Sequence, residues 1–416
     1  MSSLPPTTVY RIALLQSGLG DNGNNIEGLI NQLKLSCSLF ASNSFEIDMS
    51  HYNPLTEDFC NDNGSHSNTY EQDFINKINN IIAEAHEEYT KTILVRTRLN
   101  TVFGVGNNYN RCFYDSIENQ SKKLIKIIDS IKTHSSIRLS LIGHSQGGLV
   151  NMEAAIVRPL KIYKMISIST PYSPVKVGSN VLFFESLVNL IGSSLIDGYE
   201  SNPEYKNYLV QSVNKLTSSS YFNDLKSRWN SLGYNPSLTV ITGSSGLLKD
   251  LKYYAPLGCS MITHCPFDGL VCLSEQRSIS NASFVDLIKH NALCFHSREF
   301  ITTPPNDSCY SIVGIGQVGC SNGPNCNLPS VNLMLTGFQS LLNAAYDYFL
   351  GTDVESAEYF ANHPITIAID EGLSQISFTG SQEYQAIYDL AYDQYNHLHI
   401  LKNQETIGTI IGLLFS

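Results

Sequence analysis

Short apolar runs alternate with amphipathic segments along much of the chain. An apolar run of about four to eight residues that is closed by turn residues is typical of a strand buried on both faces. We therefore predict strands at the runs of this kind, which are 9–15, 90–97, 138–143, 163–169 and 237–243.

Two segments between these runs have the spacing of helices that cover a sheet. The apolar positions of 116–132 recur at helical intervals and include Ile117, Leu124, Ile128 and Ile131. The lysines that we expect on its outer side are Lys122, Lys123 and Lys126. A second helix is predicted over 148–157. Alternating strands and helices predict an α/β fold, with a mostly parallel sheet flanked by helices.

One long segment, 172–236, interrupts this alternation between two predicted core strands. It carries patchy amphipathic patterns, VLFFESLVNLI and YLVQSVNKL. Connections longer than about 12–15 residues are uncommon in compact domains unless they serve a function. We therefore predict that 172–236 is an inserted helical lid.

The chain divides into three parts on these patterns. Residues 1–300 are predicted to form an α/β core that includes the lid, and 391–416 to form the segment that closes this core. Between them lies 301–390, which begins near TTPPND and contains GCSNGPNC. It is predicted to be an irregular insertion or extension, and its pattern indicates no role.

Composition and charge exclude some classes of partner and location. The formal net charge of −11 offers no basic stripe to neutralise phosphates, so no nucleic-acid partner is expected. The first apolar run, Ile12 to Leu15, is too short for a signal peptide. No stretch reaches the roughly 18 apolar residues of a membrane span. The longest, 181–196, is broken by Glu185, Asn189 and Gly192. A cytoplasmic location is therefore expected.

The ten cysteines do not have the spacing of a metal site. None of them forms a C-x-x-C pair, which argues against a zinc ribbon. Most lie between Cys259 and Cys326, where they would staple loops in an oxidising compartment or remain thiols in a reducing one. Both alternatives stay open, and the missing signal peptide favours thiols.

The stretch Gly143-His144-Ser145-Gln146-Gly147 fits the pattern G-x-S-x-G between a predicted strand and a predicted helix. A serine on so sharp a turn holds a strained backbone, and glycines beside it let strand and helix approach without Cβ clashes. The turn exposes the serine Oγ, and the N–H of the next residue lies at a helix start, where it favours an oxyanion. Ser145 is therefore the candidate nucleophile.

The segment LSLIGHSQGGL resembles the nucleophile elbow of α/β-hydrolases, in particular the lipase, esterase and acyl-thioesterase branches. ALLQSGLGDN resembles the first-strand loop of these enzymes, and ISISTPYSP resembles the strand after the elbow. The resemblance implies an oxyanion hole made by the backbone N–H groups of Leu19 and Gln146. The chain departs from the pattern at Ser17, where the family usually has histidine.

The stretch FDGLVCLSEQ resembles the acid loop of the same family, which implies that Asp268 is the acid of a triad. Ser145 and Asp268 then follow in the chain order of α/β-hydrolases. Asp-Gly is also a common turn dipeptide, so a purely structural role stays open.

Two histidines compete for the role of base. His296 follows Asp268 by a comfortable interval, but ITTPPND after it cannot form the closing helix of the fold. His397 lies in HLHILKNQETIGTIIGLL, which resembles the terminal segment of the family. We therefore favour His397 and keep His296 as the alternative, ahead of His290 and His399.

The resemblance implies a serine hydrolase that cleaves a carboxylic ester through an acyl-enzyme and needs neither a metal nor an organic cofactor. An apolar stripe in the lid, with Phe183, Phe184 and Leu187, is suited to an acyl chain, which favours lipase-like or long-acyl esterase chemistry. Such a protein would bind an acyl ester, thioester or lipid and would contact a membrane surface only transiently. Thioesterase or acyltransferase chemistry, or a hydrolase that has lost activity and serves as a binding module, are the alternatives.

Overall fold

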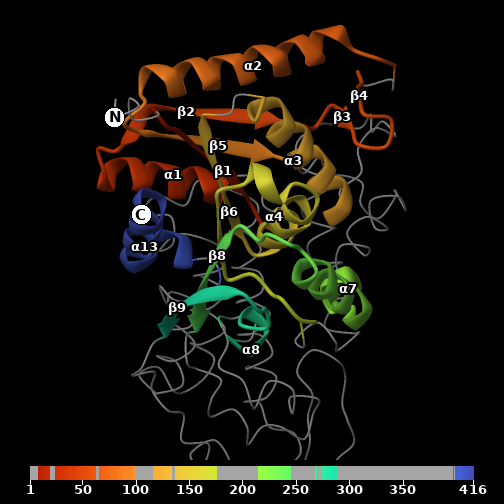
Figure 1. Cartoon of the computed structure of the whole chain (residues 1–416), viewed down its shortest axis with the longest axis vertical. Coiled ribbons are helices and arrows are strands. Elements are labelled where there is room, and N and C mark those ends of the chain that lie inside the picture. Colours follow the sequence, from red (N-terminus) through yellow and green to blue (C-terminus); the bar gives the residue numbers. More distant parts are fainter. Residues whose placement is uncertain are drawn as a thin grey trace, which may run out of the picture.

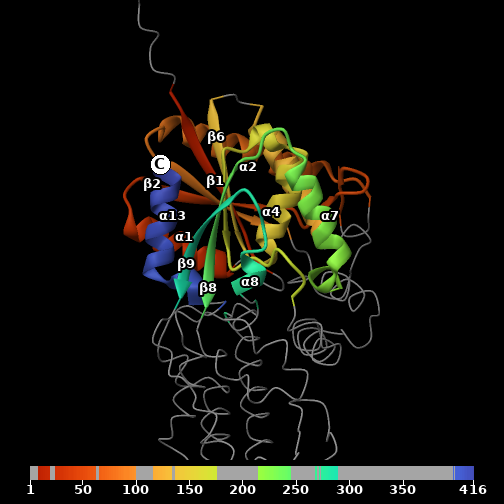
Figure 2. The same cartoon turned by 60° about the horizontal axis from the view of Figure 1, so that its bottom comes forward.

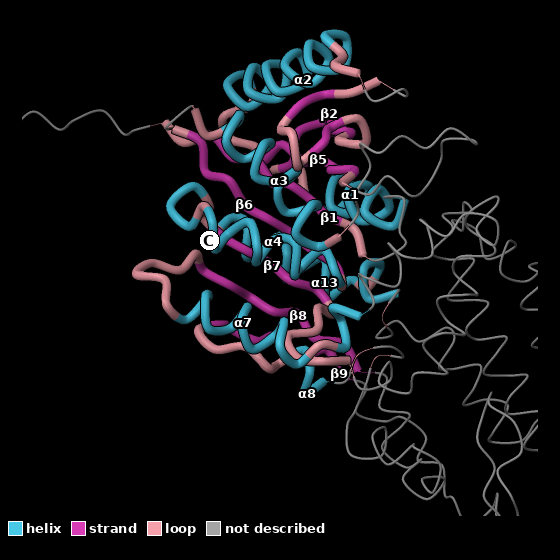
Figure 3. The backbone as a smooth tube through the Cα atoms, turned by 90° about the vertical axis from the view of Figure 1, so that its right-hand side faces the viewer, coloured by secondary structure: helices cyan, strands magenta, loops and turns pink. Residues whose placement is uncertain are grey.

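The centre of the protein is a parallel sheet of seven strands, in the order β2-β5-β1-β6-β7-β8-β9 (Figure 3). The computed structural model describes residues 8–18, 24–61, 65–99, 116–133, 136–175, 214–244, 268, 271, 273–288, 397 and 399–416. The strands of this sheet are β1 Tyr10–Gln16, β2 Phe40–Asp48, β5 Thr92–Arg98, β6 Ile137–His144, β7 Lys164–Ile168, β8 Ser237–Ser244 and β9 Ala282–Ile288. A small antiparallel pair, β3 Tyr52–Asn53 and β4 Asp58–Phe59, follows β2.

Helices cover both faces of the sheet, with α1 and α13 on one face and α2, α3, α4 and α7 on the other (Figures 1 and 2). The α-helices are α1 Asn24–Ser36, α2 Asn68–Glu87, α3 Ile117–Ile131, α4 Gln146–Val157, α7 Ser219–Asn230, α8 Leu273–Gln276 and α13 Gln404–Phe415. Two short 3-10 helices are η1 Pro159–Lys161 and η6 His399–Lys402.

The inner strands of the sheet send alternate side chains into two separate cores, because successive residues of a strand point to opposite faces. In β1, Ile12 and Leu14 pack in the core under α2, α3, α4 and α7. Ala13 and Leu15 pack in the core under α1 and α13. Burial on both faces explains why the central strands are nearly continuous apolar runs.

The predicted α/β fold is confirmed, and so are the strands foreseen at the apolar runs. The helix predicted over 116–132 runs from Ile117 to Ile131. Ser116 caps its start, where the hydroxyl accepts a hydrogen bond from the Asn119 N–H at 3.2 Å. The helix predicted from Gly148 begins two residues earlier, at Gln146, directly after the candidate nucleophile.

The expectation for one lysine of α3 is wrong. Lys122 is exposed as expected, but Lys123 is fully buried, and its Nζ donates to the carbonyl oxygen of Leu99 at 3.1 Å. The carbonyl group compensates part of the cost of placing an ammonium group in the interior. Helical spacing alone could not reveal a partner 24 residues away.

Part of the segment predicted as a lid belongs to the helical layer of the sheet. Helix α7 buries Tyr221, Phe222, Leu225 and Trp229 in the same core as α4. Arg228 of α7 also holds Glu153 of α4 through two hydrogen bonds of 2.7 and 2.9 Å. The rest of the predicted lid, 176–213, lies outside the described residues, as does 301–390.

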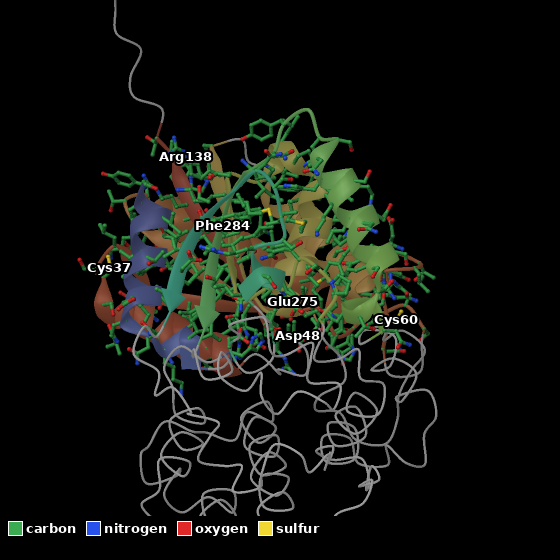
Figure 4. All side chains as sticks on the ribbon, turned by 90° about the horizontal axis from the view of Figure 1, so that it is seen from below. Cys37, Asp48, Cys60, Arg138, Glu275 and Phe284 are labelled. Carbon is green, nitrogen blue, oxygen red and sulfur yellow. The ribbon has the colours of Figure 1, made fainter. Side chains whose placement is uncertain are left out.

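The carboxyl ends of the parallel strands form one edge of the sheet. In Figure 4, Asp48 at the end of β2 and Glu275 of α8 lie near this edge, and Arg138 near the start of β6 lies at the opposite one. Parallel α/β sheets bind ligands outside the carboxyl ends of their strands. The residues described below are at this edge.

Candidate active site

Ser145 occupies a strained turn between β6 and α4. Its φ of 53° and ψ of −124° lie in a region that favours glycine, and strain of this kind costs about 1–3 kcal/mol. The Ser145 N–H donates to the Ile168 carbonyl oxygen at 2.8 Å, which fastens the turn to the neighbouring strand β7. The backbone conformation expected of an elbow serine is therefore present.

Glycines make this turn sterically feasible. A Cβ on Gly147 would lie 2.5 Å from the Ser17 carbonyl oxygen, and one on Gly143 would lie 2.6 Å from the backbone of Gly147. A Cβ on Gly148 would lie 2.0 Å from Thr170 Oγ1. Strand β6, helix α4 and the end of β1 can approach one another only because these side chains are missing.

Ser145 is the accessible residue of the elbow. It is partly exposed, whereas its neighbours His144 and Gln146 are each 1% exposed. Gln146 begins α4, and the first N–H groups of a helix have no partner within the helix. This N–H therefore carries the partial positive charge of the helix start beside Ser145.

The loop after β1 lies against the elbow. A Cβ on Gly18 would lie 3.0 Å from Ser145 Cβ and 3.3 Å from His144 Nδ1. The start of the loop that resembles an oxyanion loop therefore lies close to Ser145. Leu19, the residue predicted to supply the second N–H donor, lies outside the described residues.

Asp268 is fully buried and held on both carboxylate oxygens. Oδ1 accepts from the Val271 N–H at 2.8 Å, and Oδ2 accepts from Gln276 Nε2 at 3.2 Å. Gln276 in turn exchanges two hydrogen bonds with the backbone of Gly243 near the end of β8, at 2.9 and 3.0 Å. No role was predicted for Gln276 from the sequence, although its position in the stretch that resembles an acid loop was a signal.

His397 makes two hydrogen bonds with Asp268. Its Nδ1 lies 2.8 Å from Asp268 Oδ2, and its backbone N–H donates to the Asp268 carbonyl oxygen at 2.7 Å. A carboxylate only accepts, so Nδ1 carries the proton and Nε2 of the neutral ring is left with its lone pair. The His397 side chain is 3% exposed.

Within the described residues, the bonds of His397 do not include a direct one to Ser145 Oγ. Catalytic hydrogen bonds are often long in free enzymes and tighten only when substrate binds. The contact that joins His397 to the elbow is made instead by His144, which occupies a variable position of the G-x-S-x-G pattern.

His144 is buried beside His397. Its Nε2 lies 2.7 Å from the His397 carbonyl oxygen, and the two ring centroids are 4.8 Å apart. Burial lowers the pKa of His144 to about 3, with a smaller contribution from the nearby His397 ring and against the opposing effect of the carbonyl group. His144 is therefore neutral near pH 7 and donates from Nε2.

Several predicted residues lie outside the described part of the chain. These are Phe183, Phe184 and Leu187 of the apolar stripe and the alternative bases His296 and His290. His399 begins η6, but its side chain is not among the described residues. The structure therefore brings together Asp268 and His397, and His144 of the elbow contacts His397.

The described residues include no candidate metal site and no candidate membrane-spanning helix. Over these parts of the chain, no three His, Cys, Asp or Glu side chains gather as metal ligands would. Within the same parts, no helix has the length and apolar character needed to cross a bilayer.

No protein-family profile and no curated protein matches the sequence. Solved structures similar to the chain include a Bacillus licheniformis lipase in its mature form, at 11% identity and a TM-score of 0.33, covering 69% of this chain and 86% of the lipase. A 2-hydroxy-6-oxo-6-phenylhexa-2,4-dienoate hydrolase from Rhodococcus sp. strain RHA1 has 12% identity and a TM-score of 0.31, over 67% of this chain and 83% of the hydrolase.

A third similar structure is a lipase-esterase related protein from Clostridium acetobutylicum, at 13% identity and a TM-score of 0.31, over 71% of this chain and 93% of that protein. At such identities and TM-scores, the similar structures do not indicate the activity of this chain. Its fold class follows from its own sheet and from the turn at Ser145. A parallel sheet flanked by helices, with a strained serine between a central strand and the next helix, is the α/β-hydrolase fold.

Proposed function

We propose that the protein is a serine hydrolase that cleaves carboxylic esters through an acyl-enzyme on Ser145, with His397 as the base and Asp268 as the acid. One observation carries the proposal. A buried Asp268–His397 pair, 2.8 Å between carboxylate and imidazole, lies at the same edge of the sheet as a serine held at a φ of 53°. Such a pair orients an imidazole for proton transfer.

In the proposed reaction, His397 Nε2 takes the proton from Ser145 Oγ as this oxygen attacks the ester carbonyl carbon. The N–H groups of Gln146 and Leu19 bind the oxyanion of the tetrahedral intermediate. The imidazolium then protonates the leaving alkoxide oxygen as the C–O bond breaks. His397 next removes a proton from water as the water oxygen attacks the acyl carbon. The imidazolium then returns this proton to Ser145 Oγ as the acyl C–O bond breaks and the carboxylic acid leaves.

Asp268 has two tasks in this scheme. It accepts the Nδ1–H bond, which fixes the tautomer that leaves Nε2 free, and its negative charge stabilises the imidazolium. Gln276 and the Val271 N–H keep both carboxylate oxygens in place. The scheme requires neither a metal ion nor an organic cofactor.

The acyl group is proposed from the apolar stripe at Phe183, Phe184 and Leu187. A stripe of this kind favours a long acyl chain, as in a lipase or long-acyl esterase, and we propose that the protein contacts a lipid surface transiently. Thioester hydrolysis or transfer of the acyl group to another acceptor would use the same residues. A binding module that has lost activity is the alternative from a different class.

A series of p-nitrophenyl esters of increasing chain length, with matched thioesters, tests the proposal. We expect Ser145-dependent hydrolysis that favours esters and rises with chain length. Ser140→Ala is the matched control, because Ser140 lies in β6, the strand that leads to Ser145, five residues earlier. Turnover that Ser145→Ala abolishes and Ser140→Ala leaves intact supports the proposal. No Ser145-dependent turnover of any ester or thioester would support the binding module.

A further inference from the structure

All the described polar contacts of the His397 backbone and Nδ1 come from two residues. Asp268 binds the N–H at 2.7 Å and Nδ1 at 2.8 Å, and His144 binds the carbonyl oxygen at 2.7 Å. The first two contacts fix His397 relative to the acid. Only the third fixes it relative to the elbow.

His144 is a rigid point of attachment. It ends β6, where it pairs with Ile168 of β7, and its side chain is 1% exposed. It also precedes Ser145 directly in the chain. A hydrogen bond from its ring therefore sets the distance between the peptide that carries the nucleophile and the peptide that carries the proposed base.

We propose that His144 is a positioning residue, whose Nε2–H bond to the His397 carbonyl oxygen holds the imidazole of His397 in register with Ser145. The proposal rests on the proposed function, since it assigns a task within the same reaction. A misplacement of about 1 Å between reacting groups can cost about 100-fold in rate. A single hydrogen bond across this junction can therefore matter although His144 touches no reacting atom.

The protonation state of His144 suits this task. A carbonyl oxygen only accepts, so the bond requires a proton on Nε2. Among the described residues, Nδ1 of the neutral ring has no hydrogen-bond partner. The ring centroid lies 4.8 Å from that of His397, so a second positive charge here would oppose the imidazolium that forms during the reaction. Because burial disfavours protonation of His144, this second positive charge does not form near pH 7.

Two amide variants separate the hydrogen bond from the rest of the side chain. Glutamine places its Nε2 donor at about the reach of the histidine Nε2, whereas the asparagine amide reaches only as far as Nδ1. For p-nitrophenyl butyrate, we expect His144→Gln to retain kcat within about threefold and His144→Asn to lose about 100-fold in kcat, with KM nearly unchanged. A purely structural role predicts equal losses that follow the loss of stability.

A second measurement removes the proposed base. In a His397→Ala background there is no imidazole to position, so His144→Asn should cause no further loss of the residual rate. Non-additivity of this kind is the signature of two residues that act through one another. The fluorescence of Trp229 checks that each variant folds, and His144→Met replaces His144→Asn if the latter does not.

The outcomes are distinguishable from those that test the proposed function. Absence of Ser145-dependent turnover in the wild-type protein overturns both proposals. Turnover that His144→Asn leaves unchanged, or a loss that His144→Asn causes equally with and without His397, overturns the positioning role alone. Loss in His144→Asn, retention in His144→Gln and no further loss in the His397→Ala background support it.

Discussion

The imidazole of His397 lies 2.8 Å from the carboxylate of Asp268, although 129 residues separate the two in the sequence. If this pair orients the base, replacing the carboxylate by an amide should favour the wrong tautomer. We expect Asp268→Asn to lower kcat about 10⁴-fold toward p-nitrophenyl butyrate, as in a serine protease triad.

The matched control is Asp286→Asn. Asp286 lies in β9 and accepts hydrogen bonds from Thr242 and Arg277, so its amide variant perturbs the same end of the sheet without touching His397. We expect this control to keep kcat within about threefold. Equal losses in the two variants would mean that Asp268 acts only through the structure of its turn.

The buried His144 makes the stability of the fold depend on pH. Its pKa is lowered to about 3 in the folded protein from 6.5. Between these pH values, His144 of the unfolded chain binds a proton that His144 of the folded chain does not. The stability that comes from this difference is complete above about pH 6.5 and is lost as the pH falls. When the pH is lowered from about 7.5 to about 5, the free energy of unfolding should fall by about 2 kcal/mol more in the wild-type protein than in His144→Gln.

Urea unfolding at the two pH values measures this difference. The other titrating groups are shared by both proteins, so they cancel in the comparison. If the difference in the free energy of unfolding between the wild-type protein and His144→Gln stays constant with pH, burial does not lower the pKa of His144, and the prediction is wrong.

Gly147 should not tolerate a side chain. A Cβ there would lie 2.5 and 2.7 Å from the carbonyl oxygens of Ser17 and Gln16, which are backbone atoms and cannot swing away. We expect Gly147→Ala to cost about 1–3 kcal/mol in the free energy of unfolding and to reduce activity. Urea unfolding and ester hydrolysis together measure the two effects.

Gly28→Ala is the matched control, since Gly28 lies inside α1 and a Cβ there meets nothing within 4 Å. This variant should gain about 0.5–1 kcal/mol, because alanine costs less conformational entropy in a helix. If Gly147→Ala were as harmless as Gly28→Ala, the close packing of the elbow against β1 would be contradicted.

Trp229 is the only tryptophan of the chain, and it is fully buried in α7. We expect blue-shifted emission that moves to the red when the core unfolds. Phe222, on the same helix, is 1% exposed, and Phe222→Ala should cost about 3–5 kcal/mol. The shift of the fluorescence transition in urea measures this cost.

Leu160→Ala is the control for this prediction, because Leu160 is 80% exposed and its removal should change stability by less than about 0.5 kcal/mol. If α7 were part of a mobile lid, Phe222→Ala would alter activity and leave the unfolding transition in place. That result would contradict the assignment of α7 to the core.

The central part of the fold was predictable from the sequence because both faces of its strands are buried. β1, β5, β6, β7 and β8 are apolar runs for that reason. β2 and β9 lie at the edges of the sheet and carry polar side chains toward solvent, so their runs are broken. Helix α2 buries Phe74, Ile78, Ile81, Ile82 and Ala85 at helical spacing, and its pattern was available in the sequence.

The turn that carries Ser145 was predictable because local geometry dictates its residue types, whereas Asp268 and His397 were predicted from a family resemblance. The elbow needs glycines at fixed positions, so Gly143 and Gly147 identify it. The contacts of His144 and Gln276 depend on which residues the fold brings together from distant parts of the chain. No local pattern encodes those contacts, and spacing alone could not choose between His397 and His296.

The most direct test of the account is covalent labelling with a fluorophosphonate probe, with the modified residue located by mass spectrometry. We predict that the wild-type protein and His296→Ala label at Ser145 at similar rates, that Ser145→Ala does not label, and that His397→Ala labels far more slowly. Labelling that persists in Ser145→Ala, or that is lost in His296→Ala but not in His397→Ala, would contradict the account.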